Sequence, residues 1–221
     1  MTKEIVFVST KKDILYKRLH SLLSNFDIKW FKQKDELFKH FQEIKSKPIL
    51  ISYNHNIIFP KWLLDKIEVG YNVHAAPPEY PGRDPHHFAI YDEVKEYGAT
   101  LHLISEKVDN GPIILVSKFD CSNIHLPQDL LKIADEHALN LIEKLISMIA
   151  NGKVIRISNL NWGPRKTTRK MFLEYCKINP LISKEELQKR IRAFNVKGYS
   201  NIKLHLHGYI FKLEEDSYTN E

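Results

Sequence analysis

The sequence is poor in cysteine. Cys121 and Cys176 are the only two among 221 residues, and they lie far apart without C-x-x-C spacing. A disulfide framework or a zinc site needs several cysteines or histidines at short fixed spacings, so neither is predicted. Reduced thiols fit the cytoplasm best.

Long apolar runs are also missing. No segment approaches the roughly 20 apolar residues of a membrane helix, and the first apolar run is too short for a signal peptide. The composition, with 43% hydrophobic and 27% charged residues, is that of a globular protein. We therefore expect a soluble, cytoplasmic protein without a membrane partner.

Glycine is scarce, and the eight glycines form neither a G-x-G-x-x-G pattern nor a P-loop. A nicotinamide or ATP site of either standard kind is therefore not predicted. The excess of 33 Lys and Arg over 27 Asp and Glu gives a net charge of +6, spread along the chain. This charge indicates an anionic partner, and a nucleotide, a polyglutamated cofactor or a nucleic acid would each satisfy it.

Strands and helices alternate over the first 150 residues, which favours an α/β fold with a mostly parallel sheet. Short apolar runs typical of buried strands occupy residues 5–9, 26–31, 48–53 and 71–74. Apolar residues at helical spacing occupy segments 11–25, 34–46 and 60–68. Ligands in such sheets bind beyond the carboxyl ends of the strands, which directs attention to the loop after residue 74.

The pattern continues with a helix over residues 86–97, strands over 99–105 and 112–119, and a long helix over 127–150. We place the domain boundary at residue 152. Residues 1–152 would form the catalytic domain, and residues 153–221 a tail. The tail should contain a polar linker, a short helix that opens with a capping box at Ser183, and a β-hairpin that turns at Gly208.

The stretch NVHAAPPEYPGRDPHH, residues 72–87, carries the chemistry. Asn72 and His74 point to the same face because side chains alternate along a strand, so an amide and an imidazole can meet at one point. Two such donors can stabilise the oxyanion of an acyl-transfer intermediate, and the carboxylate of Asp109 in the later Asp-Asn-Gly turn could orient the imidazole. Taken singly, each residue also has an ordinary structural interpretation as a turn former or a hydrogen-bonded polar group.

A metal site is the weaker interpretation of the same region. Asp84, His86 and His87 could join His74 as ligands, but such groups beside a proline loop are more often hydrogen-bonding residues. We therefore expect no metal.

Together, residues 71–91 and 98–114 resemble the catalytic core of the formyltransferases that use 10-formyltetrahydrofolate. That family joins an Asn-x-His strand end, a proline-rich loop, a Thr-Leu-His strand and an Asp-x-Gly turn. The resemblance implies a Rossmann-like domain, 10-formyltetrahydrofolate as the co-substrate, and catalytic roles for Asn72, His74 and Asp109. It also implies a pterin pocket formed by main-chain groups at Ile57, Ile58, Phe59 and the Asp109 turn.

A second group of residues is predicted to bind the acceptor. The segment NWGPRKTTRK combines an indole with several cations, which suits either a solvated linker or a site for a base and its phosphates. We select Trp162, Arg165 and Lys166 from this segment. Tyr80 and Arg83 join them from the proline loop.

The resemblance also indicates the acceptor, because formyltransferases that act on different amines differ in their sequence features. The segment after the first strand lacks the glycines expected for glycinamide ribonucleotide, and the tail looks too short for initiator methionyl-tRNA. The chain is most similar to the sugar N-formyltransferases, so we predict a nucleotide-linked amino sugar, specifically a dTDP-4-amino-4,6-dideoxyhexose for surface polysaccharide, and no nucleic acid partner. Formylation of another amine, hydrolysis of formyltetrahydrofolate and non-catalytic folate binding remain the alternatives.

The tail also suggests an assembly. Ile202, Leu204 and Leu206 alternate with polar residues, so this strand has one apolar face. A two-stranded hairpin is marginal by itself, and the face needs a cover. We predict a homodimer with an interface within residues 185–213, the alternative cover being the main domain of the same chain.

Overall fold

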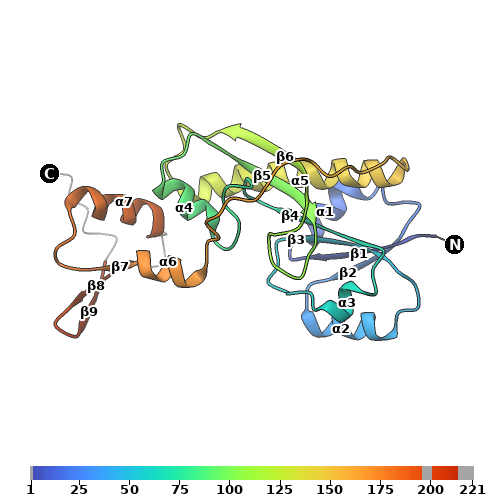
Figure 1. The fold of residues 1–221 in the computed structure, drawn as a ribbon, viewed down its shortest axis with the longest axis horizontal. Helices are drawn as coiled ribbons and strands as arrows, with labels where there is room; N and C mark the ends of the chain where they lie inside the picture. Colours follow the sequence, from blue (N-terminus) through green and yellow to red (C-terminus); the bar gives the residue numbers. More distant parts are fainter. Residues whose placement is uncertain (1, 196–200, 214–221) are drawn as a thin grey trace.

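The structure is a computed structural model that describes residues 2–195 and 201–213. A six-stranded sheet with the order β2-β1-β3-β4-β5-β6 forms its centre (Figure 1). The strands from β2 to β4 pair in parallel, whereas β5 and β6 are antiparallel to their neighbours. These strands are β1 (Glu4–Ser9), β2 (Asp27–Phe31), β3 (Ile49–Tyr53), β4 (Val69–His74), β5 (Glu96–Leu103) and β6 (Ile113–Asp120).

Helices cover both faces of the sheet. Leu15 of α1 and Ile142 of α5 belong to the apolar core on one face, whereas Leu37 of α2 and Leu63 of α3 belong to the core on the other. Burial on both faces explains why the central strands are continuous apolar runs. The bounds are α1 (Lys12–Leu19), α2 (Lys34–Glu43), α3 (Lys61–Leu64), α4 (Pro85–Tyr91) and α5 (Pro127–Ala150). The predicted fold class is confirmed.

Four predicted helices extend too far: α1 ends at Leu19, α2 at Glu43 and α3 at Leu64, rather than at residues 25, 46 and 68, and α4 is the fourth. We expected residues 86–97 to be helical, but α4 ends at Tyr91. Glu93 then adopts a left-handed φ of 53°, a conformation that ends helices. Tyr97 instead lies in β5, where its side chain is fully buried. The burial of this large ring in the sheet outweighs the local helical pattern.

The tail begins with an extended segment, residues 153–168, which we call the strap. It runs back beside α5 and β6 (Figure 1), and the Ser158 amide donates to the Ile113 carbonyl at 2.8 Å. After the strap come α6 (Arg169–Tyr175), β7 (Lys177–Ile178), α7 (Lys184–Phe194), β8 (Lys203–Leu206) and β9 (Tyr209–Lys212). The sequence pattern did not predict α6 and β7, whereas the predicted cap at Ser183 and turn at Gly208 are confirmed.

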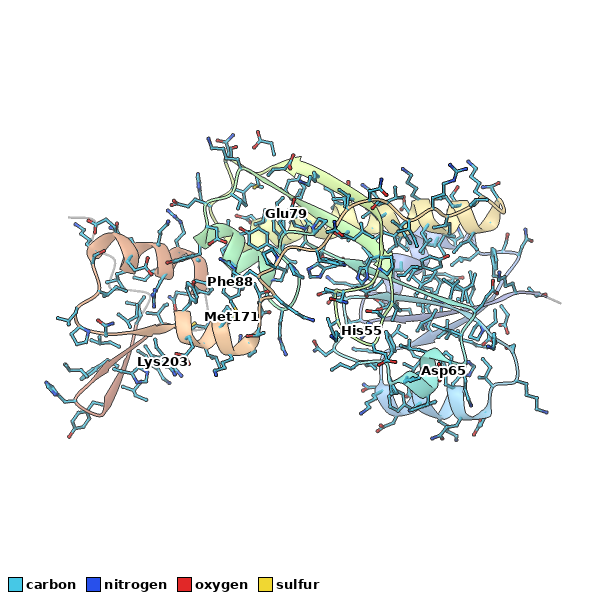
Figure 2. All side chains as sticks on the ribbon, viewed as in Figure 1. His55, Asp65, Glu79, Phe88, Met171 and Lys203 are labelled. Carbon is cyan, nitrogen blue, oxygen red and sulfur yellow. The ribbon has the colours of Figure 1, made fainter. Side chains whose placement is uncertain are left out.

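The tail shares a core with the main domain. Phe172 of α6 and Phe194 of α7 pack with Phe88 of α4 in one buried cluster. Figure 2 shows Phe88 and Met171 close together at this junction. The boundary at residue 152 stays a prediction, and residues 196–200 and 214–221 of the tail lie outside the described residues.

The apolar face of β8 is covered by the same chain, which corrects part of our reasoning on assembly. Ile202 is 4% exposed and Leu204 is partly buried, and both pack in the cluster that contains α4 and α7. β8 also pairs with β7, so the hairpin belongs to a three-stranded sheet. The exposed apolar side chains lie instead on β9, at Tyr209, Ile210 and Phe211.

Candidate active site

The three predicted catalytic residues lie together at one end of the sheet. Asn72 and His74 occupy the carboxyl end of β4, and Asp109 lies in the turn between β5 and β6. His74 Nδ1 is 3.7 Å from Asp109 Oδ2. All three side chains line the same cleft, as the alternation along β4 predicted.

A fourth residue, His102, completes the group. Its Nε2 accepts a hydrogen bond from Asn72 Nδ2 at 2.9 Å and lies 3.6 Å from Asp109 Oδ1. The sequence contains the signal, the Thr-Leu-His strand, but we assigned it no role. His102 reaches the site because β5 pairs antiparallel with β4, in a register that places it opposite Asn72.

The geometry identifies the free nitrogen of His74. His74 Nε2 lies 2.9 Å from the Tyr80 carbonyl, which can only accept, so this nitrogen carries the proton. In the neutral ring Nδ1 then holds the lone pair, and this is the nitrogen that faces Asp109. His74 is therefore arranged to accept a proton at Nδ1, beside a carboxylate that can balance the resulting positive charge.

Asp109 is held as a buried carboxylate. Only 7% of the residue is exposed, and its backbone has a left-handed φ of 45°. Burial opposes ionisation, but the attraction of a positively charged His74 ring and the hydrogen bond from the Gly82 amide outweigh it and hold the pKa of Asp109 well below its usual value.

The proline loop, residues 75–84, is fixed to the strap. Gly82 donates its amide to Asp109 Oδ2 at 2.9 Å and has a φ of 106°, which favours glycine. The strap contacts the same bend, because the Thr167 amide donates to the Pro81 carbonyl and the Thr167 carbonyl accepts from the Arg83 amide. A residue of the tail thus holds the backbone that contacts the Asp109 carboxylate.

The cleft has a volume of about 750 Å³, which suits a ligand larger than a single amino acid. The predicted cofactor residues Ile57, Ile58 and Phe59 line it, and Ile58 is exposed. Of the predicted acceptor residues, Arg83 and Lys166 line it as well. His86 also contributes, and among the described residues its Nδ1 has no hydrogen-bond partner. Burial lowers the pKa of His86 to about 3, so its ring is neutral.

The other predicted acceptor residues, Tyr80, Trp162 and Arg165, do not line the cleft. Trp162 donates its Nε1 hydrogen to the Gly111 carbonyl at 2.8 Å, and its ring meets His102 and His74 edge to face, at centroid distances of 4.9 and 6.1 Å. Tyr80 and Arg165 both bind the carboxylate of Asp92. A direct contact with the acceptor therefore stays a prediction for these three residues.

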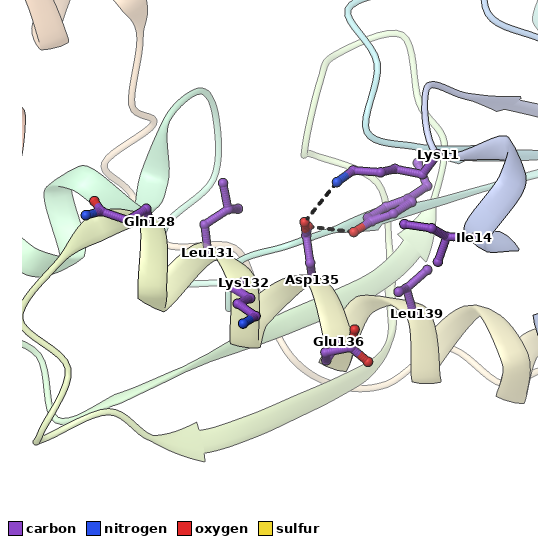
Figure 3. Close-up of a pocket in the computed structure, with 9 residues that line it drawn as sticks. Lys11, Ile14, Gln128, Leu131, Lys132, Asp135, Glu136 and Leu139 are labelled. Carbon is purple, nitrogen blue, oxygen red and sulfur yellow. Dashed lines mark hydrogen bonds and ion pairs between the residues drawn. The ribbon is translucent and has the colours of Figure 1, made fainter. Parts of the chain in front are cut away.

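A smaller hollow of about 340 Å³ adjoins the cleft between α1 and α5 (Figure 3). Asp135 lies between its two partners, Lys11 and Tyr53, at 3.6 and 2.6 Å. Lys11 and Asp135 line both spaces, so the hollow extends the cleft.

Within residues 2–195 and 201–213, no three His, Cys, Asp or Glu side chains are grouped so that they could hold a metal ion. The same part of the chain contains no helix with the length and apolar character needed to cross a membrane.

A family model described as formyl transferase matches residues 3–134, more than half of the chain. The chain belongs to the formyl transferase family. Methionyl-tRNA formyltransferase of Pseudoalteromonas translucida is 29% identical over 150 residues, which cover 66% of this chain and 46% of that protein. The chain thus spans less than half the length of this curated relative.

Solved structures of this family have the same fold. A sugar N-formyltransferase from a Shewanella species superposes with a TM-score of 0.74 at 15% identity, covering 96% of this chain and 97% of that one. An N-formyltransferase from Helicobacter canadensis, solved in complex with folinic acid and dTDP-3-aminofucose, has a TM-score of 0.67 at 19% identity, covering 94% of this chain and 85% of that one.

Proposed function

We propose that this member of the formyl transferase family transfers the formyl group of 10-formyltetrahydrofolate to the amine of a nucleotide-linked amino sugar. The observation that carries the proposal is the convergence of Asn72, His74 and Asp109 in one cleft. A set of three groups with an amide donor, a base nitrogen and a buried carboxylate suits acyl transfer to an amine.

In the proposed reaction Asn72, His74 and Asp109 each have a separate role. The amine nitrogen attacks the formyl carbon, and the Asn72 amide donates to the oxygen that becomes negative. His74 Nδ1 accepts the proton that the amine loses, and Asp109 balances the charge that the ring gains. The intermediate then collapses, the bond between the formyl carbon and N10 of the folate breaks, and N10 takes up the proton from His74, which returns to its neutral form.

The cofactor assignment rests on the cleft and on the family. Ile57, Ile58, Phe59 and Asp109 line one continuous space beside the catalytic groups. The relative from Helicobacter canadensis is in complex with a formylated folate, which supports a folate of the same kind here.

The acceptor assignment rests on charge and on similarity of fold. Arg83 and Lys166 bring positive charge to the cleft, where a diphosphate would need it. Contacts of Tyr80, Trp162 and Arg165 with the acceptor also belong to the proposal, although these three residues do not line the cleft. Two relatives with matching folds are named for N-formylation, one of them of sugars. We propose that the acceptor is a dTDP-4-amino-4,6-dideoxyhexose and that the product is used for surface polysaccharide. A cytoplasmic location of the protein is part of the same proposal.

We also propose a homodimer that forms through the tail. β9 has one edge paired to β8, and its side chains Tyr209, Ile210 and Phe211 are 72%, 58% and 52% exposed. An exposed apolar strand at a sheet edge favours pairing with a second strand, and a second copy of β9 matches it in a two-fold contact. Residues 196–200 of the predicted interface lie outside the described residues.

The test is a substrate panel. The purified protein is incubated with 10-formyltetrahydrofolate and with 3-amino and 4-amino sugars linked to dTDP, UDP or GDP, and the products are weighed by mass spectrometry. Gain of one formyl group by an amino sugar supports the proposal. Exclusive formylation of methionyl-tRNA or glycinamide ribonucleotide would replace the acceptor, formate release without any amine would indicate a hydrolase, and folate binding without turnover would indicate a binding module.

A further inference from the structure

His55, just beyond β3, is held at both ring nitrogens. Its Nδ1 lies 2.9 Å from the Ile57 amide, which can only donate, so Nδ1 carries the lone pair. Its Nε2 lies 2.6 Å from Ser52 Oγ. The neutral ring therefore carries its proton on Nε2 and donates it to the serine. Figure 2 shows His55 beside the sheet, in the main domain.

The direction of this bond determines the bonds that follow it. Ser52 Oγ accepts from His55 and so donates its own hydrogen to Asn72 Oδ1, at 2.6 Å. Asn72 Nδ2 in turn donates to His102 Nε2 at 2.9 Å. His102 Nδ1 donates to the Leu103 carbonyl at 2.8 Å, which leaves Nε2 as the acceptor that Asn72 requires. Both ends of the chain of hydrogen bonds thus demand the same direction.

The consequence concerns the amide of Asn72. One Nδ2 hydrogen is used on His102, and the oxygen is occupied by Ser52, so only the second Nδ2 hydrogen remains for the cleft. A flipped amide would place its oxygen against His102 Nε2, so that two acceptors would face each other. It would also place its hydrogens against the hydroxyl hydrogen of Ser52, so that two donors would face each other. The bonds therefore keep a donor, rather than an acceptor, available for a formyl oxygen.

We propose that His55 is a positioning residue that, through Ser52, fixes the orientation of the catalytic amide of Asn72. His55 also joins this amide to the main chain of the proposed cofactor loop, because the bond to the Ile57 amide fixes the start of that loop. The ring further packs against Phe59 at a centroid distance of 5.3 Å. The role in turnover rests on the proposed function, whereas the hydrogen-bond direction does not.

Burial keeps the His55 ring neutral, which is the form required by the chain of hydrogen bonds from His55 through Ser52 to Asn72, here called the relay. It lowers the pKa of His55 from 6.5 to about 4, so the ring is neutral at physiological pH. A protonated ring would turn Nδ1 into a donor and would oppose the Ile57 amide.

The kinetic test separates hydrogen bonding from packing. His55→Phe keeps a ring against Phe59 but removes both nitrogens, and Ser52→Ala removes the relay with little change in volume. Both should lower kcat about tenfold, the effect of one ordinary hydrogen bond, and leave KM for the acceptor within about twofold. His55→Gln, whose amide nitrogen can replace Nε2, should recover most of the loss. The exposed His125→Phe is the matched control and should behave as wild type.

A second measurement does not depend on turnover. In protein labelled with nitrogen-15, the side-chain amide hydrogens of Asn72 should exchange slowly, and His55 should show the Nε2-protonated tautomer. Ser52→Ala and His55→Phe should shift and speed up the Asn72 signals, and His125→Phe should not. Unchanged Asn72 signals, or a kcat unaffected by Ser52→Ala, would overturn the proposal. If the two variants shift the Asn72 signals but the wild-type protein formylates no acceptor, the role of His55 in orienting Asn72 stands and the proposed function is rejected.

Discussion

Asp109→Asn should lower kcat between a hundredfold and a thousandfold while the fold stays intact. The two carboxylate oxygens lie 3.7 Å from His74 Nδ1 and 3.6 Å from His102 Nε2. At this separation a pair of unit charges interacts by about 4 kcal/mol at an effective dielectric constant near 20, which corresponds to roughly a thousandfold in rate. The amide of asparagine retains part of this interaction as a dipole, so the loss should fall below that limit.

Steady-state kinetics with 10-formyltetrahydrofolate and the acceptor found in the panel would measure the effect, beside circular dichroism. Asp65→Asn is the matched control, because Asp65, labelled in Figure 2, is an exposed carboxylate that follows α3 and does not line the cleft. It should leave kcat unchanged. A kcat near that of the wild type in Asp109→Asn would show that the carboxylate does not stabilise charge on His74, and would refute the proposed proton transfer.

Three further outcomes follow from the structure. Burial lowers the pKa of His55 from 6.5 to about 4 and that of His86 from 6.5 to about 3, so the unfolded chain binds more protons below pH 6.5. Denaturant unfolding should therefore show stability falling below pH 6.5 by up to about 1.4 kcal/mol per unit for each ring, and a flat profile would contradict this burial. Gly82→Ala places a Cβ 2.2 Å from a backbone carbonyl at a φ of 106° and should cost about 3 kcal/mol of unfolding free energy, whereas Gly152→Ala, with open space around it, should cost about 1 kcal/mol. Phe211→Lys should shift the protein toward monomer in sedimentation velocity and Leu181→Lys, at an exposed leucine before α7, should not; a wild type that is already monomeric at micromolar concentration would reject the dimer.

The sequence allowed prediction of features that depend on local spacing. Alternation along one strand was enough to place Asn72 and His74 on the same face, and the Asp-Asn-Gly motif was enough to place Asp109 in a connection between strands. The helix at residues 127–150 has the predicted bounds, because a proline opens it and a glycine follows its end.

Features that depend on long-range pairing could not be predicted. His102 enters the site only because β5 lies antiparallel to β4 in one register, and the sequence pattern of a strand carries no information about its partner. Trp162 illustrates the same limit. Its neighbouring cations favoured a stacking role, but the strap brings its indole hydrogen to Gly111 and its edge to the imidazoles of His74 and His102.

The contact between the strap and the proline loop indicates that the proposed active site depends on the tail as well as on residues 1–152. The backbone of Thr167 holds the bend at Gly82 from both sides, and Gly82 donates directly to Asp109. Phe88 of α4 is fully buried, and Tyr175 of α6 and Phe194 of α7 pack their rings against it. A chain cut at residue 152 would lose the partner of the bend and would expose this core. The tail therefore contributes to the geometry of the carboxylate, through the two backbone hydrogen bonds of Thr167 and the bond from the Gly82 amide to the Asp109 side chain.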